Sequence, residues 1–158
     1  MGATSNPFED EDRRAIWQML VERDIAAFLA ADWSLVDGDF AKSEFHGINA
    51  HFKPEPQNWT MQFATLEAYR DEWLRQAAET ASTTYAEPLK DALYRATDLS
   101  RIELHGERAL ARKVFDGTVR RADGGEDRLD WQTLYFCARR DGRWRITGFV
   151  GYLPRFAR

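Results

Sequence analysis

Three short turn signals divide the second half of the sequence into four alternating segments, and this pattern limits the possible folds more than any other feature. The signals are His105-Gly106-Glu107, Asp123-Gly124-Gly125 and Asp141-Gly142. Aspartate followed by glycine is typical of tight hairpins. We therefore expect strands over residues 99–104, 109–119, 129–139 and 144–152. Strands joined by consecutive hairpins form an antiparallel meander.

The first half of the chain is mainly helical in pattern. From Glu9 to about Asp32, apolar residues recur at spacings of one, three and four, which indicates a helix; they are Ile16, Trp17, Leu20, Val21, Ile25, Phe28 and Leu29. A second short helical piece is expected from Trp33 to Phe40, interrupted at Gly38. Thr65 is expected to cap a further helix that reaches about Ala77.

Shorter elements complete the first half. Residues 45–53 and 60–63 are predicted strands, 54–58 a loop, and 87–94 a weaker helical turn. Helices that precede a meander favour an α+β fold over alternating βαβ units. We predict a single domain over residues 1–158, with 1–7 as a flexible tail. Its N-terminal helices would pack on a curved, mostly antiparallel sheet, and a meander that bends around a long helix leaves a cavity at the wide end.

Composition excludes several classes of partner. The net charge of −4 argues against general nucleic-acid binding. The basic clusters at Arg120–Arg121 and Arg139–Arg145 are interleaved with acids, so we interpret them as solvated hairpin ends. No apolar run approaches the length of a membrane span. Cys137 is the only cysteine, and no export signal is recognisable, so we expect a cytoplasmic protein without an intrachain disulfide.

No cofactor is expected from the sequence. It contains no glycine loop that would cradle a phosphate, no nucleotide fingerprint and no zinc-ligand spacing. Aromatic residues are abundant, at 13% of the chain. Side chains of this size fill a core, line an apolar pocket or anchor an interface.

Asp24 is the most unusual polar residue of the first helix. At roughly 100° per residue it falls in the middle of the apolar arc formed by residues such as Leu20 and Phe28. An inward carboxylate must be paired, hydrogen-bonded, protonated or beside a wet cavity. It is either a general acid or base at the pocket, or a structural acid bonded to Arg70, to a tryptophan N–H or to backbone.

Several local motifs resemble the nuclear transport factor 2-like superfamily, and most closely its SnoaL-like branch. They are Ala30-Ala31-Asp32-Trp33, Thr65-Leu66-Glu67-Ala68-Tyr69-Arg70, Trp131-Gln132-Thr133-Leu134-Tyr135-Phe136, and the tail from Asp141 to Phe149. The resemblance covers roughly residues 9–154. It implies the cone-shaped fold and a homodimer formed through the outer sheet face. This superfamily includes isomerases, dehydratases, epoxide hydrolases, polyketide cyclases and non-catalytic binding modules, so fold does not decide function.

Two catalytic sets of this superfamily are incomplete here. Ketosteroid isomerases place a tyrosine eight residues before the aspartate that ends the first helix, and counting back from Asp32 gives Asp24. Their base corresponds roughly to residues 47–49, which contain no carboxylate. SnoaL-type cyclases place an aspartate base where this chain has Tyr135. Neither reaction can therefore be carried over.

Other candidates have both a functional and a structural interpretation. Arg70 would form an ion pair with Asp24 or bind an anionic ligand. Alternatively, its aliphatic part packs on the core and its guanidinium lies in solvent. His46 and His51 would point to opposite faces of a strand, so they make no joint metal site, although one could face the pocket as an acid or base.

Tyr135 would donate to a ligand carbonyl, fill the core or lie at a dimer interface. Cys137 fits a small buried hydrophobe better than a nucleophile. Asp116 lines the pocket or marks a bulge. The proposed catalytic residues are thus Asp24, Tyr135 and His46, without a metal. The proposed pocket residues are Trp17, Leu20, Phe28, Trp33, Asn49, His51, Tyr69, Arg70, Trp73, Asp116, Trp131 and Phe149.

Two hypotheses follow. The first is a pocket protein that carries out cofactor-free acid/base chemistry on an apolar carbonyl compound: isomerisation, dehydration or aldol-type ring closure. The second is a non-catalytic ligand-binding or dimerisation module of the same fold.

Overall fold

A computed structural model describes residues 5–155 and has the predicted α+β architecture. The helical elements are α1 (Glu11–Trp17), the π-helical turn η1 (Gln18–Arg23), α2 (Asp24–Ala30), the 3₁₀ turns η2 (Trp33–Leu35), η3 (Asp37–Asp39) and η4 (Pro56–Asn58), α3 (Leu66–Ala81) and α4 (Leu89–Ala96). The strands are β1 (His46–Asn49), β2 (Thr60–Phe63), β3 (Thr97–His105), β4 (Arg108–Arg120), β5 (Glu126–Arg140) and β6 (Arg143–Leu153).

Local capping explains where the main helices begin and end. The Asp10 carboxylate accepts a hydrogen bond from the Arg13 N–H at 3.0 Å at the start of α1. The Thr65 hydroxyl oxygen accepts from the Ala68 N–H at 3.2 Å, so its prediction as an N-cap is confirmed. Ala31 adopts a left-handed conformation (φ 50°) and ends α2.

The six strands form one mixed sheet in the order β2-β1-β6-β5-β4-β3. The predicted meander is confirmed: β3 to β6 pair antiparallel with their neighbours in the chain. Among the strands of the described residues, only β1 and β6 pair in parallel, and Phe40 adds an isolated parallel bridge to Ile146. The β4–β5 pairing is continuous, whereas the β5–β6 register shifts between Gln132 and Leu134 and again between Phe136 and Cys137. Such irregularities bend a sheet, and this one curves around the helices.

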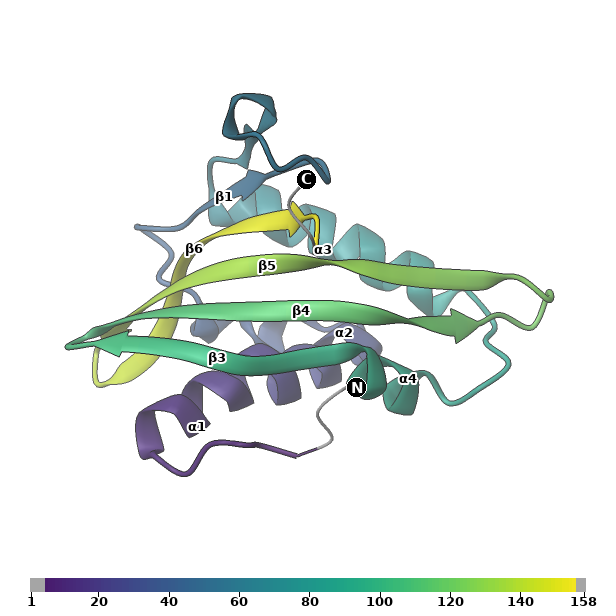
Figure 1. The fold of residues 1–158 in the computed structure, drawn as a ribbon, viewed down its shortest axis with the longest axis horizontal. Coiled ribbons are helices and arrows are strands. Elements are labelled where there is room, and N and C mark those ends of the chain that lie inside the picture. Colours follow the sequence, from purple (N-terminus) through teal and green to yellow (C-terminus); the bar gives the residue numbers. More distant parts are fainter. Residues whose placement is uncertain (1–4, 156–158) are drawn as a thin grey trace.

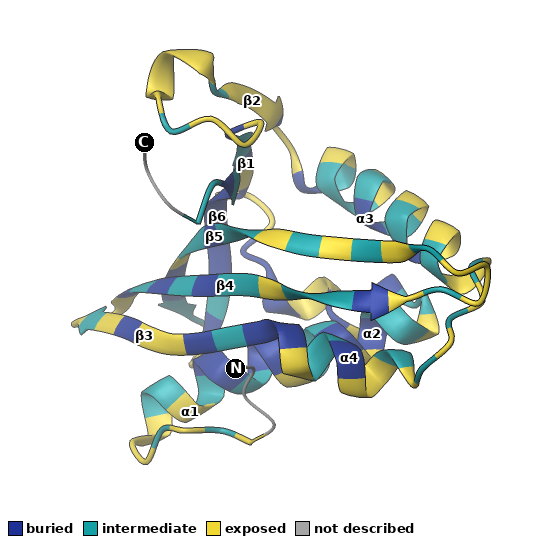
Figure 2. Cartoon of the chain, turned by 45° about the vertical axis from the view of Figure 1, so that its right-hand side comes forward, coloured by how far each residue is buried: buried dark blue, intermediate teal, exposed yellow. Residues whose placement is uncertain are grey.

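The sheet has one covered and one open face. In Figure 1, α2 and α3 lie behind the strands and leave the other face towards the viewer. Buried residues of α3, such as Trp73 and Ala77, face the sheet, and its far side is exposed (Figure 2). The core between these layers contains Ile16, Trp17, Leu20, Val21, Leu99 and Phe149 among others.

Only part of the predicted flexible tail is described. Residues 1–4 lie outside the described residues. Residues 5–7 are irregular, and the Asn6 amide donates to the Arg14 carbonyl at 3.1 Å, which holds this segment against α1.

Candidate functional site

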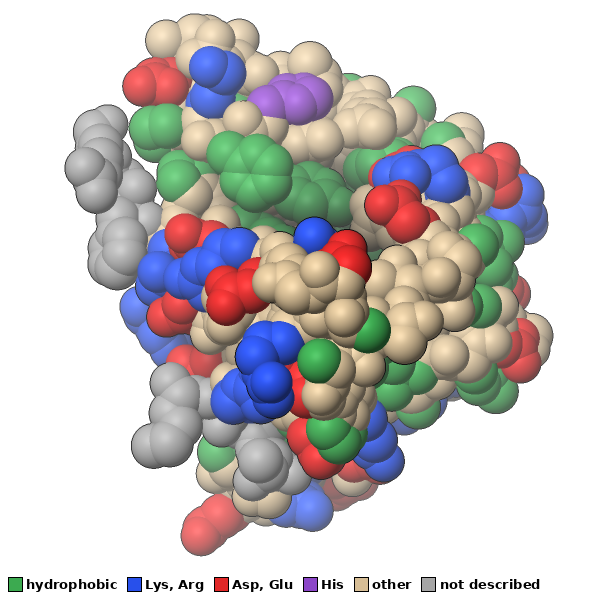
Figure 3. Space-filling view, turned by 90° about the vertical axis from the view of Figure 1, so that its right-hand side faces the viewer, with side chains coloured by type: hydrophobic (Ala, Val, Ile, Leu, Met, Phe, Trp, Pro, Cys, Tyr) green, Lys and Arg blue, Asp and Glu red, His purple; other side chains and the backbone are tan. Residues whose placement is uncertain are grey.

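A cavity of about 450 Å³ lies between the helices and the inner face of the sheet. Its walls come from α2, α3, α4 and the inward side chains of β4, β5 and β6. Seen from the end of the molecule where β4 and β5 are joined, hydrophobic side chains gather in a hollow (Figure 3). The cavity is therefore open to solvent and large enough for a small molecule.

An ion pair between Asp24 and Lys113 is the main charged feature of the cavity. Lys113 Nζ lies 3.1 Å from Asp24 Oδ2 and also donates to the Leu20 carbonyl at 2.5 Å. The Lys113 side chain is only 1% exposed, whereas Asp24 is 36% exposed. Both side chains are among the residues that line the cavity, and the carboxylate is the more exposed member of the pair. The second carboxylate oxygen, Asp24 Oδ1, has no hydrogen-bond partner in the part of the chain that the structure describes.

The π-helical turn η1 brings these groups together. A π turn contains one residue more than the α-helical repeat, and such turns are frequent at functional sites. Asp24 follows η1 directly and faces the cavity, as its place in the apolar arc predicts. Leu20, whose carbonyl binds Lys113, lies within the same turn.

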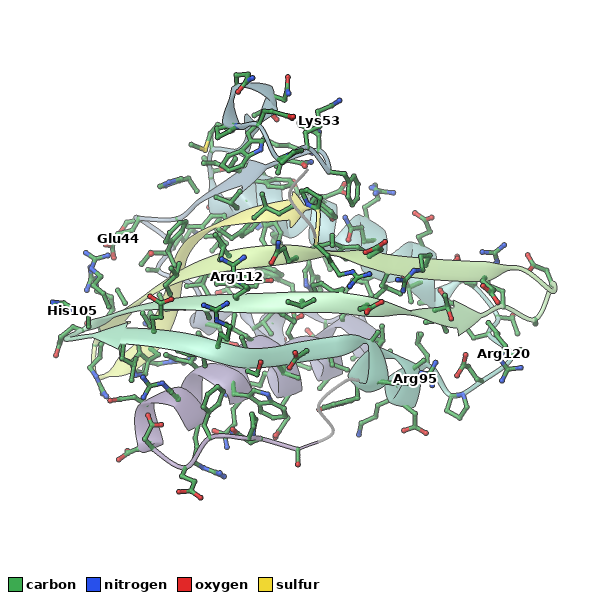
Figure 4. The ribbon with its side chains drawn as sticks, viewed as in Figure 1. Glu44, Lys53, Arg95, His105, Arg112 and Arg120 are labelled. Carbon is green, nitrogen blue, oxygen red and sulfur yellow. The ribbon has the colours of Figure 1, made fainter. Side chains whose placement is uncertain are left out.

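Lys113 is not among the residues predicted for the site. Successive strand residues point to opposite faces. Arg112 projects from the outer face of β4 in Figure 4, so Lys113 must point inward. The alternation of strand residues could have indicated this position, because Lys113 lies on the same face of the strand as Ala111 and Phe115. A lysine at an alternate position among small and apolar residues predicts an inward cation.

Two tyrosine hydroxyls add hydrogen-bond donors to the cavity. Tyr69 comes from α3 and Tyr135 from β5. Neither hydroxyl has a hydrogen-bond partner within residues 5–155. Burial raises the pKa of Tyr69 well above its usual value of 10, and the nearby Tyr135 and Asp24 add to this. Burial, followed by the Asp24 charge, raises the pKa of Tyr135 in the same direction. Both phenols therefore remain protonated and able to donate at neutral pH.

The remaining walls are mostly aromatic. Phe28 packs edge-on against Trp73 with centroids 5.6 Å apart, and Phe115 lies 4.7 Å from Trp131. The polar side chains at the mouth are paired with one another. Arg75 forms an ion pair with Glu79 at 3.0 Å, and the Tyr85 hydroxyl donates a hydrogen bond to Asp127 at 2.8 Å. A ligand that enters the cavity would therefore pass side chains whose charges are paired, contact aromatic rings and reach the carboxylate of Asp24.

The structure gathers part of the predicted set in this cavity. The predicted residues that line it are Asp24, Phe28, Tyr69, Trp73, Trp131, Tyr135 and Phe149. Trp17, Leu20 and Trp33 are instead buried core residues outside the lining. Trp17 and Leu20 belong to the apolar arc of the first helix, which is wider than the part that faces the cavity. Trp33 lies on η2, and its ring stacks on Phe40 with centroids 5.1 Å apart.

The predicted residues of β1 and its following turn also lie outside the lining. His46 is exposed. Asn49 donates to Gln62 at 2.6 Å, and His51 Nε2 lies 2.7 Å from the Thr60 hydroxyl. Because β1 pairs with β2 near one edge of the sheet, these polar groups bind each other instead of reaching the cavity.

Two further predicted pocket residues lie outside the lining. Arg70 donates to Asp71 at 3.0 Å and is 40% exposed, so its place is the surface of α3, and Asp24 pairs with Lys113 instead. Asp116 is exposed and accepts from Arg128 at 2.7 Å.

Cys137 is fully buried beside the site, in keeping with a small hydrophobe. Burial raises the pKa of its thiol to about 12, which removes the thiolate needed for nucleophilic chemistry.

Among residues 5–155, no group of three or more His, Cys, Asp or Glu side chains is placed to hold a metal ion. No helix in the same range is long and apolar enough to cross a membrane.

Comparisons with solved structures confirm the nuclear transport factor 2-like fold. A domain of unknown function with a cystatin-like fold from Nostoc punctiforme aligns with a TM-score of 0.63 at 14% identity, over 95% of this chain and 81% of that one. An NTF2-like protein of unknown function from Methylobacillus flagellatus aligns with a TM-score of 0.56 at 14% identity, covering 96% and 98%.

A third similar structure is a putative calcium/calmodulin-dependent protein kinase II association domain from Xanthomonas campestris, with a TM-score of 0.56 at 15% identity over 98% and 94% of the two chains. Neither a protein-family model nor a curated protein sequence matches this chain. At these identities the likeness establishes the fold alone, and the SnoaL-like branch stays a prediction.

Proposed function

We propose that this protein binds an apolar carbonyl compound in its cavity and catalyses a cofactor-free proton transfer on it. One observation carries the proposal: Asp24, Tyr69 and Tyr135 line the same cavity, and Asp24 Oδ1 and both tyrosine hydroxyls have no hydrogen-bond partner among the described residues. Unpartnered polar groups in an aromatic cavity favour a ligand that supplies the missing acceptor and proton.

The roles follow from the chemistry of each group. The hydroxyl of Tyr135 or Tyr69 donates to the carbonyl oxygen and stabilises the negative charge that develops there. Asp24 removes a proton from the neighbouring carbon and returns it elsewhere. Lys113 holds the carboxylate through Oδ2 and leaves Oδ1 to react. Isomerisation, dehydration and aldol-type ring closure all use this proton transfer.

A hydrogen-exchange experiment tests the proposal without knowledge of the natural substrate. The probe is 2-acetylnaphthalene in D₂O, and proton NMR follows the loss of its methyl signal. We expect the protein to accelerate exchange and the Asp24→Asn variant to lose at least about 100-fold of that acceleration. His46→Ala is the matched control, because His46 is exposed and outside the lining. Full exchange by folded Asp24→Asn would refute the role of Asp24.

The second candidate is a binding module without chemistry. The observation that favours it is the Asp24–Lys113 pair itself, since a structural acid also needs such a partner. Binding of the naphthyl ketone, seen as quenching of the tryptophan fluorescence to which the cavity residues Trp73 and Trp131 contribute, without accelerated exchange would support this candidate.

We also propose a cytoplasmic location for the reaction. The chain has a single cysteine and would gain no intrachain disulfide from an oxidising compartment.

A further inference from the structure

Lys113 differs from the other lysines in its environment. It is the only lysine among the buried charged residues of the part that the structure describes. Lys42 is 72% exposed, and Lys53 and Lys90 are also exposed. Lys113 reaches the cavity from β4, between the carboxylate of Asp24 and the ring of Phe115, whose centroid is 5.1 Å from Nζ.

These surroundings provide what a lysine needs to react with a carbonyl group. The neutral amine is the nucleophilic form of a lysine, so a reacting lysine needs a neighbouring group that can take its proton, and the Asp24 carboxylate is in that position. The two partners are 3.1 Å apart, within direct proton-transfer distance. A proton that passes from Nζ to Oδ2 leaves a neutral amine beside a carboxylic acid, without a separate base from solvent.

We propose that Lys113 forms a reversible imine with an apolar aldehyde or ketone bound in the cavity. The inference rests on the proposed function, because the carbonyl compound must first enter the cavity. It adds a covalent step to a site where the first proposal requires only hydrogen bonds and proton transfer.

All proton transfers of the imine formation take place between Lys113, Asp24 and the bound carbonyl compound. Lys113 gives a proton to Asp24, and its nitrogen lone pair forms the C–N bond while the carbonyl π electrons move to oxygen. The alkoxide takes a proton from the new ammonium, which gives a carbinolamine. Asp24 returns its proton to that hydroxyl, the C–O bond breaks, and water leaves. The products are a protonated imine, an Asp24 carboxylate and one water molecule, so the charge of the pair is unchanged.

Because the net charge of the pair is unchanged, the protonated imine can keep the contacts that the Lys113 ammonium makes. The protonated imine keeps one N–H, which replaces the ammonium as the donor to Asp24 Oδ2. The cation remains beside the ring of Phe115. An iminium also acidifies the neighbouring C–H groups, so Asp24 would then act as the base on a more acidic carbon than in the free ketone.

Reductive trapping tests the proposal. The full-length protein is incubated with 2-naphthaldehyde and sodium cyanoborohydride, then digested and mapped by mass spectrometry. We expect a naphthylmethyl group on Lys113 at a rate at least about tenfold above Lys42, Lys53 and Lys90, which serve as internal references. Labelling should saturate with aldehyde concentration and fall when 2-naphthylmethanol, which has no carbonyl, occupies the cavity.

Two variants and a binding measurement keep the test decisive. Lys113→Met should abolish the selective label, and Asp24→Asn should slow it at least about tenfold, because the acid that expels water is lost. If Trp73 and Trp131 fluorescence shows that the aldehyde binds but only the exposed lysines are labelled, the imine is overturned and the cavity proposal stands. If the aldehyde does not bind, both proposals fail. Selective labelling of wild-type Lys113 supports the imine even if a variant does not fold.

Discussion

Asp24 and Lys113 differ in how far each is exposed to solvent, so removing one partner has a different energetic cost from removing the other. Lys113 is almost fully enclosed, whereas about a third of the Asp24 side chain is exposed. A buried ammonium without its carboxylate remains desolvated and uncompensated. A carboxylate at the cavity surface without its ammonium can still be hydrated. The free energy of unfolding should therefore respond asymmetrically.

We predict that Asp24→Leu lowers the free energy of unfolding by about 3 kcal/mol and Lys113→Met by only about 1 kcal/mol. The double variant should recover most of the loss, because no charge is left buried. Urea unfolding of the four proteins measures the cycle. Equal losses in the two single variants would show that the exposure of Asp24 does not matter.

The buried thiol of Cys137 gives the stability a pH dependence. Its pKa rises from 9 to about 12 on folding, so between these values the unfolded chain loses the proton first. The stabilisation is complete below about pH 9 and decreases as the pH rises towards 12. At about pH 10.5 the loss is about 2 kcal/mol relative to about pH 8. The buried tyrosines act in the same direction at higher pH.

The control for this prediction is Cys137→Ala, which lacks the titrating group but keeps the tyrosines. Urea midpoints of both proteins at about pH 8 and about pH 10.5 give the difference. If the variant loses as much stability as the wild type over this interval, the thiol contributes nothing to the pH dependence.

At the scale of residues, the inward position of Asp24 could be predicted because it depends on the helical repeat of a few neighbours. Its partner could not, because Lys113 lies 89 residues away in the sequence. Arg70 was a plausible partner by charge and by its own apolar face, yet α3 directs it to Asp71. Alternation along β4 can indicate that Lys113 points inward, but no local pattern specifies which distant residue it meets there.

At the scale of elements, the parallel pairing of β1 with β6 depends on a close approach of two backbones. A Cβ on Gly148 of β6 would lie 2.6 Å from the carbonyl oxygen of His46 on β1. This contact involves backbone, which cannot move aside as a flexible side chain can. Gly148 therefore fixes the position of β1, and β1 in turn supports β2 at the sheet edge.

We predict that Gly148→Ala lowers the free energy of unfolding by about 2 kcal/mol or more, because β1 must shift away from β6. Gly38→Ala is the matched control. Its Cβ would lie 3.4 Å from the flexible Arg143 side chain, and we expect a change within about 0.5 kcal/mol. Urea unfolding measures both. A Gly148→Ala protein as stable as the control would mean that the β1–β6 contact is easily relaxed.

The meander was predictable because each hairpin is set by a turn between neighbouring strands. The parallel β1–β6 pair was not, because it joins segments about a hundred residues apart and no local turn specifies it. The π-helical turn was also missed. An apolar arc of this width tolerates one extra residue, so the sequence pattern resembles that of an ordinary helix.

At the scale of the whole molecule, the two faces of the sheet differ in character. The inner face holds the cavity with its ion pair and tyrosines. The outer face carries a small apolar cluster of Ile48, Ala50, Trp59, Leu134, Val150 and Leu153. On β5, Phe136 alternates with the inward residues Tyr135 and Cys137 and is 41% exposed beside Leu110. Arg112 lies in the middle of this face (Figure 4).

We predict that the protein forms a homodimer through this outer face, with Phe136 buried between the two copies. An exposed aromatic next to an apolar cluster is a suitable anchor for an interface. Phe136→Glu should then place a desolvated charge at the contact and convert the dimer to a monomer at micromolar concentration. Multi-angle light scattering after size-exclusion chromatography measures the mass.

The control for the dimer is Leu35→Glu. Leu35 is 51% exposed but lies on the turn η2, away from the outer face, so this variant should keep the mass of the wild type. The hollow of the cavity is seen at the end of the molecule (Figure 3), and Phe136 is not among its lining residues, so the Phe136→Glu monomer should still bind 2-acetylnaphthalene. A wild-type monomer, or a Phe136→Glu dimer, would remove the outer face from the interface. Loss of ligand binding on dissociation would instead show that the second copy is needed to complete the cavity.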